Sequence, residues 1–238
     1  MFDNQLDFRN ENSLKESINL LANKIALKGL LEINSNKYRI TDFEFYINSY
    51  SADIQDPHTY NHDLQRKTAK LYDHKSGLDI TFGDGNNAVG VLIRGIAKLE
   101  TLDINSPSKY FISAYFDGPH KARTEIISNI KFNENNTLQF NEEYTEMDTY
   151  LKSHGIEVIS TKRVNLTPKA TDVKGKYIYE PLRYVVLIPK FFYNEEGKLV
   201  SNGNPIKING IEQIIKNAIN ENTIDPDLAD FILGYKIK

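Results

Sequence analysis

The feature that most constrains the fold is the segment at residues 38–47, which reads Tyr-Arg-Ile-Thr-Asp-Phe-Glu-Phe-Tyr-Ile. β-Branched and aromatic residues dominate it, and its polar and apolar positions partly alternate, which is typical of a β-strand. Successive side chains of a strand point to opposite faces. We therefore expect Phe43, Phe45 and Ile47 to line the core.

The opposite face of this strand carries Asp42, Glu44 and Tyr46. Two carboxylates and a phenol on one side of a strand are a plausible wall for a polar site. The alternative is an ordinary solvated sheet surface, because half-exposed strands commonly carry acidic residues. Two close carboxylates would also raise the pKa of one of them, which would suit a general base.

The segments around this strand predict an α+β protein. Leu14, Ile18, Leu21 and Ile25 recur at helical spacing, after a capping-box pattern at residues 13–16. Residues 30–33 should pair with 38–47 as a hairpin, and residues 48–67 should form a loop. Further segments are expected as strands at 78–82, 89–99 and 177–189 and as helices at 118–129, 143–152, 211–219 and 226–233.

Strands that return by hairpins, without regular βαβ alternation, favour a curved and mainly antiparallel sheet flanked by helices. We expect one α+β domain over residues 1–190. Residues 191–238 should form a C-terminal extension with a hairpin turn at 194–197 and amphipathic helices.

Composition limits the chemistry. The chain of 238 residues has no cysteine, which excludes disulfides, thiolate catalysis and cysteine-ligated metals. Its five histidines lack metal-ligand spacing, so no metal or other cofactor is expected. No apolar run is long enough to span a membrane, and the N-terminus is unlike a secretory signal, so we expect a cytoplasmic protein.

Charge argues against a strongly basic nucleic-acid surface, because the formal net charge is −3. Local basic clusters remain at residues 66–70, at 121–123 and around 162–169. Lys121 and Arg123 stand at the expected start of the helix at 118–129, where they oppose the helix dipole, which makes sense if they face an anion.

Several short motifs occur in the order seen in the 3-methyladenine (alkyladenine) DNA glycosylase family, and residues 14–190 resemble that family as a divergent member. The motifs are Glu44-Phe45-Tyr46, a histidine at His58 or His62, Gly90-Val91-Leu92-Ile93-Arg94, Gly118-Pro119-His120-Lys121, Arg163-Val164 and Glu180-Pro181-Leu182-Arg183-Tyr184. Residues 64–77 depart from the family pattern, and they suggest no side chain that would wedge into DNA.

The resemblance implies the alkyladenine-glycosylase fold, which is like the C-terminal domain of formyltransferases. It implies hydrolysis of the N-glycosidic bond of an alkylated or otherwise modified base flipped out of DNA, with water activated by Glu44. Tyr46 and His62, or His58 in its place, would hold the base and its nucleotide. Tyr72 and Asp42 complete the expected substrate-binding set.

DNA is therefore the expected partner, and the oligomeric state is left open. Arg94, Lys121 and Arg163 are the expected phosphate contacts. Arg94 interrupts an otherwise apolar strand. The alternative to a phosphate contact is therefore an internal ion pair between Arg94 and Asp79 or Glu100. No lysine beside Glu44 suggests a Schiff base, which favours a water-based mechanism.

The alternative function is a non-catalytic protein that binds nucleic acid, a base or a protein partner.

Overall fold

The computed structural model describes residues 6–101, 110–130, 138–142, 158–163, 165–172, 175–186, 191–193 and 199–201. Its helices are α1 (Glu11–Lys28), α2 (Pro119–Ser128) and α4 (Lys176–Tyr179). Its strands are β1 (Gly29–Ile33), β2 (Asn36–Ser49), β3 (Ile54–Gln55), β4 (Thr68–His74), β5 (Gly77–Phe82), β6 (Ala88–Thr101), β7 (Tyr110–Asp117), β8 (Leu138–Glu142), β9 (Val158–Thr161), β10 (Arg183–Val186), β11 (Phe191–Tyr193) and β12 (Leu199–Ser201).

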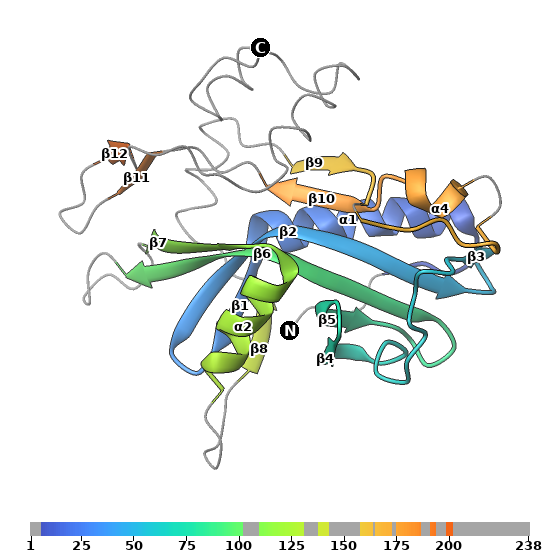
Figure 1. Cartoon of the computed structure of the whole chain (residues 1–238), viewed down its shortest axis with the longest axis horizontal. Coiled ribbons are helices and arrows are strands. Elements are labelled where there is room, and N and C mark those ends of the chain that lie inside the picture. Colours follow the sequence, from blue (N-terminus) through green and yellow to red (C-terminus); the bar gives the residue numbers. More distant parts are fainter. Residues whose placement is uncertain are drawn as a thin grey trace.

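Ten of these strands form one open sheet built around β2 and β6 (Figure 1). The main path runs β4-β5-β6-β2-β1-β8, while β7 pairs with β6, β3 and β10 pair with β2, and β9 pairs with β10. Every pairing between described strands is antiparallel. The predicted α+β class with a mainly antiparallel sheet is thus confirmed.

The predicted first helix is confirmed, but its cap is not the capping box at residues 13–16. The side chain of Asn10 accepts a hydrogen bond from the Ser13 amide at 2.9 Å, so α1 begins at Glu11. Asparagine is among the best N-cap residues. With Asn10 as the cap, Ser13 lies inside the first turn of α1. Gly29 ends the helix, as predicted.

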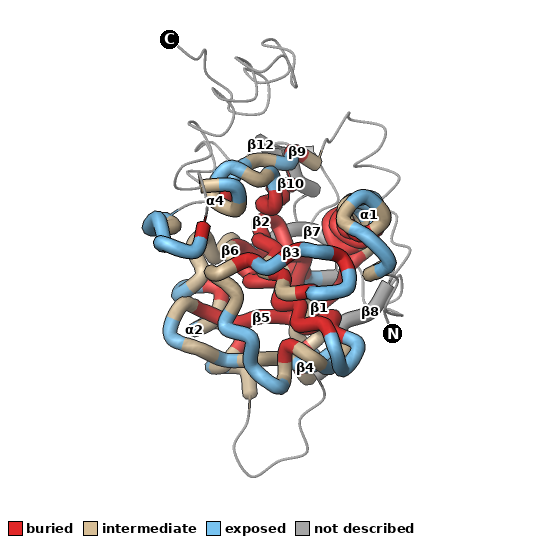
Figure 2. The backbone as a smooth tube through the Cα atoms, turned by 90° about the vertical axis from the view of Figure 1, so that its right-hand side faces the viewer, coloured by how far each residue is buried: buried red, intermediate tan, exposed pale blue. Residues whose placement is uncertain are grey.

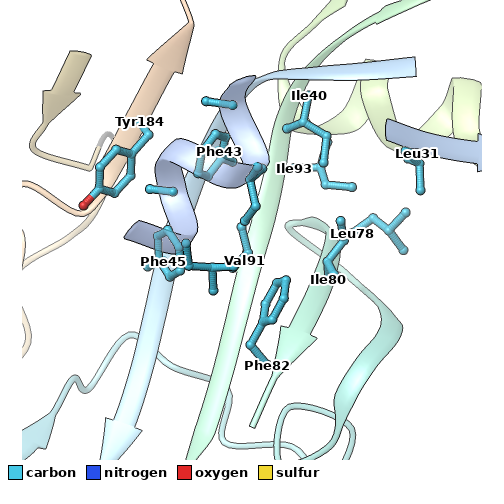
Figure 3. Close-up of a cluster of buried hydrophobic side chains, with 14 of the residues drawn as sticks. Leu31, Ile40, Phe43, Phe45, Leu78, Ile80, Phe82, Val91, Ile93 and Tyr184 are labelled. Atoms are coloured by element: carbon cyan, nitrogen blue, oxygen red, sulfur yellow. The ribbon is translucent and has the colours of Figure 1, made fainter. Parts of the chain in front are cut away.

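The two helices α1 and α2 lie on opposite faces of the sheet, with α1 behind it and α2 in front of it in Figure 1. Phe43 and Phe45 point to the α1 face and pack against Tyr184 of β10, with ring centroids 5.6 Å apart in both pairs (Figure 3). The Tyr184 hydroxyl donates to Asn19 of α1 at 2.5 Å. The buried residues run through the middle of the sheet, as the red strands in Figure 2 show.

The prediction of one continuous strand over residues 177–189 is wrong in its first part. Residues 176–179 form α4, because Gly175 takes a left-handed φ of 69° and the Asp172 carboxylate accepts the Tyr177 amide. Strand β10 begins only at Arg183. Residues 138–142 pair with β1 as β8, a strand that was not expected from the sequence.

Several expectations lie outside the described residues. These are the helices at 143–152, 211–219 and 226–233, the hairpin turn at 194–197 and most of the extension at 191–238. On either side of that turn, β11 and β12 pair antiparallel.

Replacing Phe45 by alanine should lower the free energy of unfolding by about 3–5 kcal/mol, because it leaves a cavity in a packed core. Phe45 is 0% exposed and contacts both Phe43 and Tyr184. Urea denaturation measures the change. Leu20→Ala is the control, because Leu20 is 65% exposed and should cost little. Equal losses in the two variants would contradict this placement of the core.

Candidate functional site

A row of directly opposed residues crosses five neighbouring strands on the face that α2 covers. The row is Arg183 in β10, Glu44 in β2, Leu92 in β6, Asp79 in β5 and Tyr72 in β4. Directly opposed residues of an antiparallel pair share a face. A Cβ on Gly77 would touch both Leu92 and Pro119, so the start of α2 lies over this same face. The sheet therefore has one aromatic and aliphatic face and one face that gathers charged residues.

Glu44 lies at the centre of this charged face and is 0% exposed. Its carboxylate accepts a hydrogen bond from the Tyr46 hydroxyl at 2.7 Å and lies 3.4 Å from the Arg94 guanidinium. Burial, followed by the nearby Glu44 charge, raises the pKa of Tyr46 well above its ordinary value. The phenol therefore stays protonated and keeps donating to Glu44.

Arg94 forms the internal ion pair that was one of its two expected roles, but with other partners. Its guanidinium lies 3.7 Å from Asp42 and 3.4 Å from Glu44, and its side chain is 12% exposed. The neighbours expected from sequence were Asp79 and Glu100. The acidic residues of β2 are instead the closer ones, because Asp42 and Glu44 stand on the same face as Arg94 in the adjacent strand.

Asp42 is held by Arg183 through two hydrogen bonds, at 2.8 and 2.5 Å. Both residues are about as buried as the hydrophobic core, at 2% exposure each. Burial alone would lower the pKa of Arg183, but its bonds to Asp42 outweigh this and raise the pKa. The pair fastens β10 to β2 on the charged face.

Arg163 was expected to contact DNA phosphate, and the structure corrects this. Its side chain is 0% exposed and pairs with Asp56 at 2.5 Å. It also donates to the Tyr177 carbonyl and lies over the Tyr46 ring, 4.6 Å from the centroid. Arg163 thus supports Tyr46 from behind and ties the loop after β9 to the loop after β3.

A cavity of about 270 Å³ opens beside Tyr46 on the charged face. Its lining combines rings, hydroxyls and two lysines: Tyr46, His58, Thr59, Tyr60, His74, Lys75, Ser76, Asp79, Leu92, Asn165, Leu166, Thr167 and Lys169. Small-molecule sites are typically concave, with aromatic walls and few polar groups. A cavity of this size suits a single flat ring system, with room for little more.

His74 and Asp79 form one wall of the cavity. The Nε2 atom of His74 lies 2.9 Å from Asp79, and its Nδ1 accepts the Ser76 amide at 3.3 Å. Neutral His74 therefore carries its proton on Nε2. The Asp79 carboxylate also accepts a hydrogen bond from the Gln65 side chain at 2.9 Å. A side chain at position 90 would collide with both groups, so Gly90 leaves room for this contact. Both ring nitrogens of His74 are thus engaged in hydrogen bonds, so a ligand in the cavity would meet the face of the ring. Because Nδ1 accepts the Ser76 amide and Nε2 binds Asp79, His74 is not arranged to take a proton from the Ser76 hydroxyl as in a serine hydrolase.

His58 forms the opposite wall. Its side chain is 5% exposed, and its Nε2 lies 3.7 Å from Asp172, too far for a hydrogen bond. Among the residues that the structure describes, neither this Nε2 nor the Asp172 Oδ2 has a hydrogen-bond partner. Burial lowers the pKa of His58 below its ordinary value. Burial thus favours the neutral imidazole beside the cavity.

Of the two candidate histidines, His58 lines the cavity. The Asp56 carboxylate accepts the His58 amide at 3.0 Å and turns His58 toward the cavity. His62 lies outside the cavity lining and stacks on Tyr72, with centroids 4.4 Å apart. Lys121 is exposed on α2 and is also outside the lining.

Sequence reasoning missed Tyr60, His74, Asp79 and residues 165–169 as cavity residues. Tyr72 and His74 alternate along β4, and this period-2 pattern was the available signal. Their position depends on the pairing of β4 with β5, which follows a register shift between Thr68 and Leu71. Such an irregularity leaves no readable mark in the sequence.

Comparison with protein-family models and with curated proteins found no match. Within the described residues, no three acidic or histidine side chains gather closely enough to hold a metal ion. In the same part of the chain, no helix combines the length and the apolar character needed to cross a membrane.

Replacing Arg183 by methionine should cost about 3–5 kcal/mol in unfolding free energy, because it leaves the Asp42 carboxylate buried without its main partner. Adding Asp42→Leu to that variant should recover most of the loss. Arg9→Met is the matched control, since the Arg9–Asp7 pair is exposed and should contribute little. Chemical denaturation of the four proteins measures this, and an Arg183 variant as stable as the control would refute the assigned role.

Stability should fall on mild acidification because of His58. Its folded-state pKa is lowered, so below about pH 6.5 the unfolded chain takes up a proton that the folded protein excludes. Between about pH 7.5 and 5.5, wild type should lose more stability than His58→Phe, by at most about 1.4 kcal/mol per pH unit. Thermal unfolding at both pH values measures this, with His120→Phe, an exposed histidine on α2, as the control. Identical pH dependence in all three proteins would count against a buried neutral His58.

Proposed function

We propose that this protein is a DNA glycosylase, which hydrolyses the N-glycosidic bond of a modified base held in the ring-lined cavity. One observation carries the proposal. Tyr46 both lines the cavity and donates a hydrogen bond to the buried Glu44 carboxylate. A flat ligand against Tyr46 therefore comes close to an acidic group that can take part in chemistry. The fold would then be of the alkyladenine-glycosylase type that the sequence motifs suggest.

The chemistry requires a carboxylate that activates water and stabilises a positively charged sugar as the base departs. Water adds to the anomeric carbon, the carbon–nitrogen bond breaks, and the base leaves with a proton. Glu44 lies in a site from which solvent is excluded, where its charge acts more strongly than in water. On this proposal the Tyr46 hydroxyl moves off Glu44 when the base enters, and a water molecule takes its place.

The cavity walls suit an extruded base. Such a base is held by stacking on aromatic rings and by hydrogen bonds to its edges. Tyr46, Tyr60, His58 and His74 supply the rings, while Asn165 supplies an amide. Lys75 and Lys169 are exposed lysines in the lining, where they can meet the phosphates that flank an extruded nucleotide. Lys121 at the start of α2 is a further candidate.

The second candidate is a nucleic-acid-binding protein without catalysis. It is favoured by the complete enclosure of Glu44, which Tyr46 and Arg94 both contact. In that case the Glu44–Arg94 pair would be structural, and the cavity would only hold a base.

Glu44→Gln should reduce base release at least about 100-fold, the usual contribution of a general base. Glutamine keeps the shape of the side chain but cannot take up the proton or carry the charge, so DNA binding should be retained. Release of free base from DNA that contains alkylated purines measures the first effect, and fluorescence anisotropy measures the second.

Glu16→Gln is the control, because Glu16 is an exposed glutamate on α1, on the other face of the sheet. Wild type that binds the modified DNA but releases no base would reject the glycosylase and leave the binding protein. Full activity in Glu44→Gln would reject the role given to this carboxylate.

A further inference from the structure

Four aromatic rings form a continuous array that leads from the cavity to the surface. We call these residues, Tyr60, His62, Tyr72 and His74, the ring platform. His62 stacks on Tyr72 with ring centroids 4.4 Å apart and an interplanar angle of 7°, and the ring centroids of Tyr72 and His74 are 5.0 Å apart. Tyr60 lies 4.7 Å from His74 and 6.2 Å from Tyr72. Only Tyr60 and His74 line the cavity, so the other two rings extend beyond it.

The outer end of the ring platform is open to solvent. His62 is exposed, Tyr60 is 42% exposed, and Tyr72 is half-buried. Tyr72 and His74 belong to β4, which lies at one edge of the described sheet path. An exposed imidazole supported from below by a parallel phenol ring presents a rigid flat surface.

Three exposed lysines stand close to these rings along the chain: Lys67 and Lys70 between His62 and Tyr72, and Lys75 next to His74, where it also lines the cavity. Lys67, Lys70 and Lys75 are exposed and make no ion pair with another described residue. The nearest acidic residue of β4, Asp73, is already paired with Arg123 of α2. Exposed flat rings together with nearby lysines are a combination that binds single-stranded nucleic acids, since bases stack on the rings while phosphates meet the cations.

We propose that the ring platform stacks the base next to the one in the cavity, and that the substrate is a modified base in an unpaired segment of DNA. In a duplex, both faces of each base are covered by its neighbours, so an exposed protein ring can stack only on a base that is unpaired. This inference rests on the proposed function in one respect, that the modified base lies in the cavity. The stacking itself follows from the four rings and the three lysines.

The test uses two opposite substitutions of His62. His62 also accepts the Leu64 amide through Nδ1 at 3.1 Å, so removing the ring could act through the loop alone. His62→Asn keeps an acceptor for that amide and removes the ring. His62→Phe keeps a ring and removes the acceptor. Tyr50→Ala is the control, because Tyr50 is 71% exposed in the turn after β2 and makes no ring contact with another described residue.

Fluorescence anisotropy of the full chain with a labelled oligonucleotide of about ten nucleotides, single-stranded or annealed to its complement, gives the affinities. Wild type should bind the single strand more tightly than the duplex. His62→Asn should weaken single-strand binding about fivefold or more, while His62→Phe and Tyr50→Ala stay close to wild type. Duplex binding as tight as single-strand binding, or equal losses in the Asn and Phe variants, would overturn the proposal.

Base release from the same modified oligonucleotides separates this proposal from the glycosylase proposal. Ring-dependent binding of the single strand without any base release would support the ring platform and reject the glycosylase. Equal base release from single strand and duplex, unchanged in His62→Asn, would support the glycosylase and overturn the ring platform.

Discussion

The buried pair of Arg183 and Asp42 is the interaction on which the rest of the charged face depends. A buried carboxylate is costly unless it is paired and hydrogen-bonded, and here two hydrogen bonds meet that need. The pair joins β10 to the middle of β2, which orders the segment around it. Strand β9 pairs with β10, and shortly after it along the chain Arg163 binds Asp56 and Asn165 lines the cavity.

The same strand that carries Asp42 also provides the link to the proposed chemistry. Along β2, Asp42, Glu44 and Tyr46 point to one face, and each has a different surrounding: Asp42 meets an arginine of β10, Glu44 meets Arg94 of β6, and Tyr46 reaches the cavity. The phenol thus stands between a buried acidic centre and an open site. On the proposed function, the Glu44 carboxylate stays bound to the Tyr46 hydroxyl until a ligand displaces that hydroxyl.

Local sequence signals were enough to predict several elements: apolar periodicity for α1, alternation for β2 and β5, a nearly continuous apolar run for β6, and Gly118-Pro119 at the start of α2. Alternation also placed Glu44 and Tyr46 on one face. It did not reveal that this face is buried, because Arg183, which pairs with Asp42, lies 141 positions further along the chain. Which of His58 and His62 would line the cavity could not be read from the sequence for a similar reason: it depends on one turn, in which Asp56 accepts the His58 amide. Strand propensity misled at residues 176–179, where Gly175 and Asp172 begin a helix.

On the proposed function, the cavity beside Tyr46 receives a base whose sugar faces Glu44. A crystal structure of the Glu44→Gln variant bound to single-stranded DNA with one alkylated purine would test it most directly. We expect the modified base between Tyr46 and His74, with the anomeric carbon turned toward position 44 and the Tyr46 hydroxyl moved away from it. An empty cavity, with DNA bound elsewhere or the base pointing away from position 44, would contradict the account.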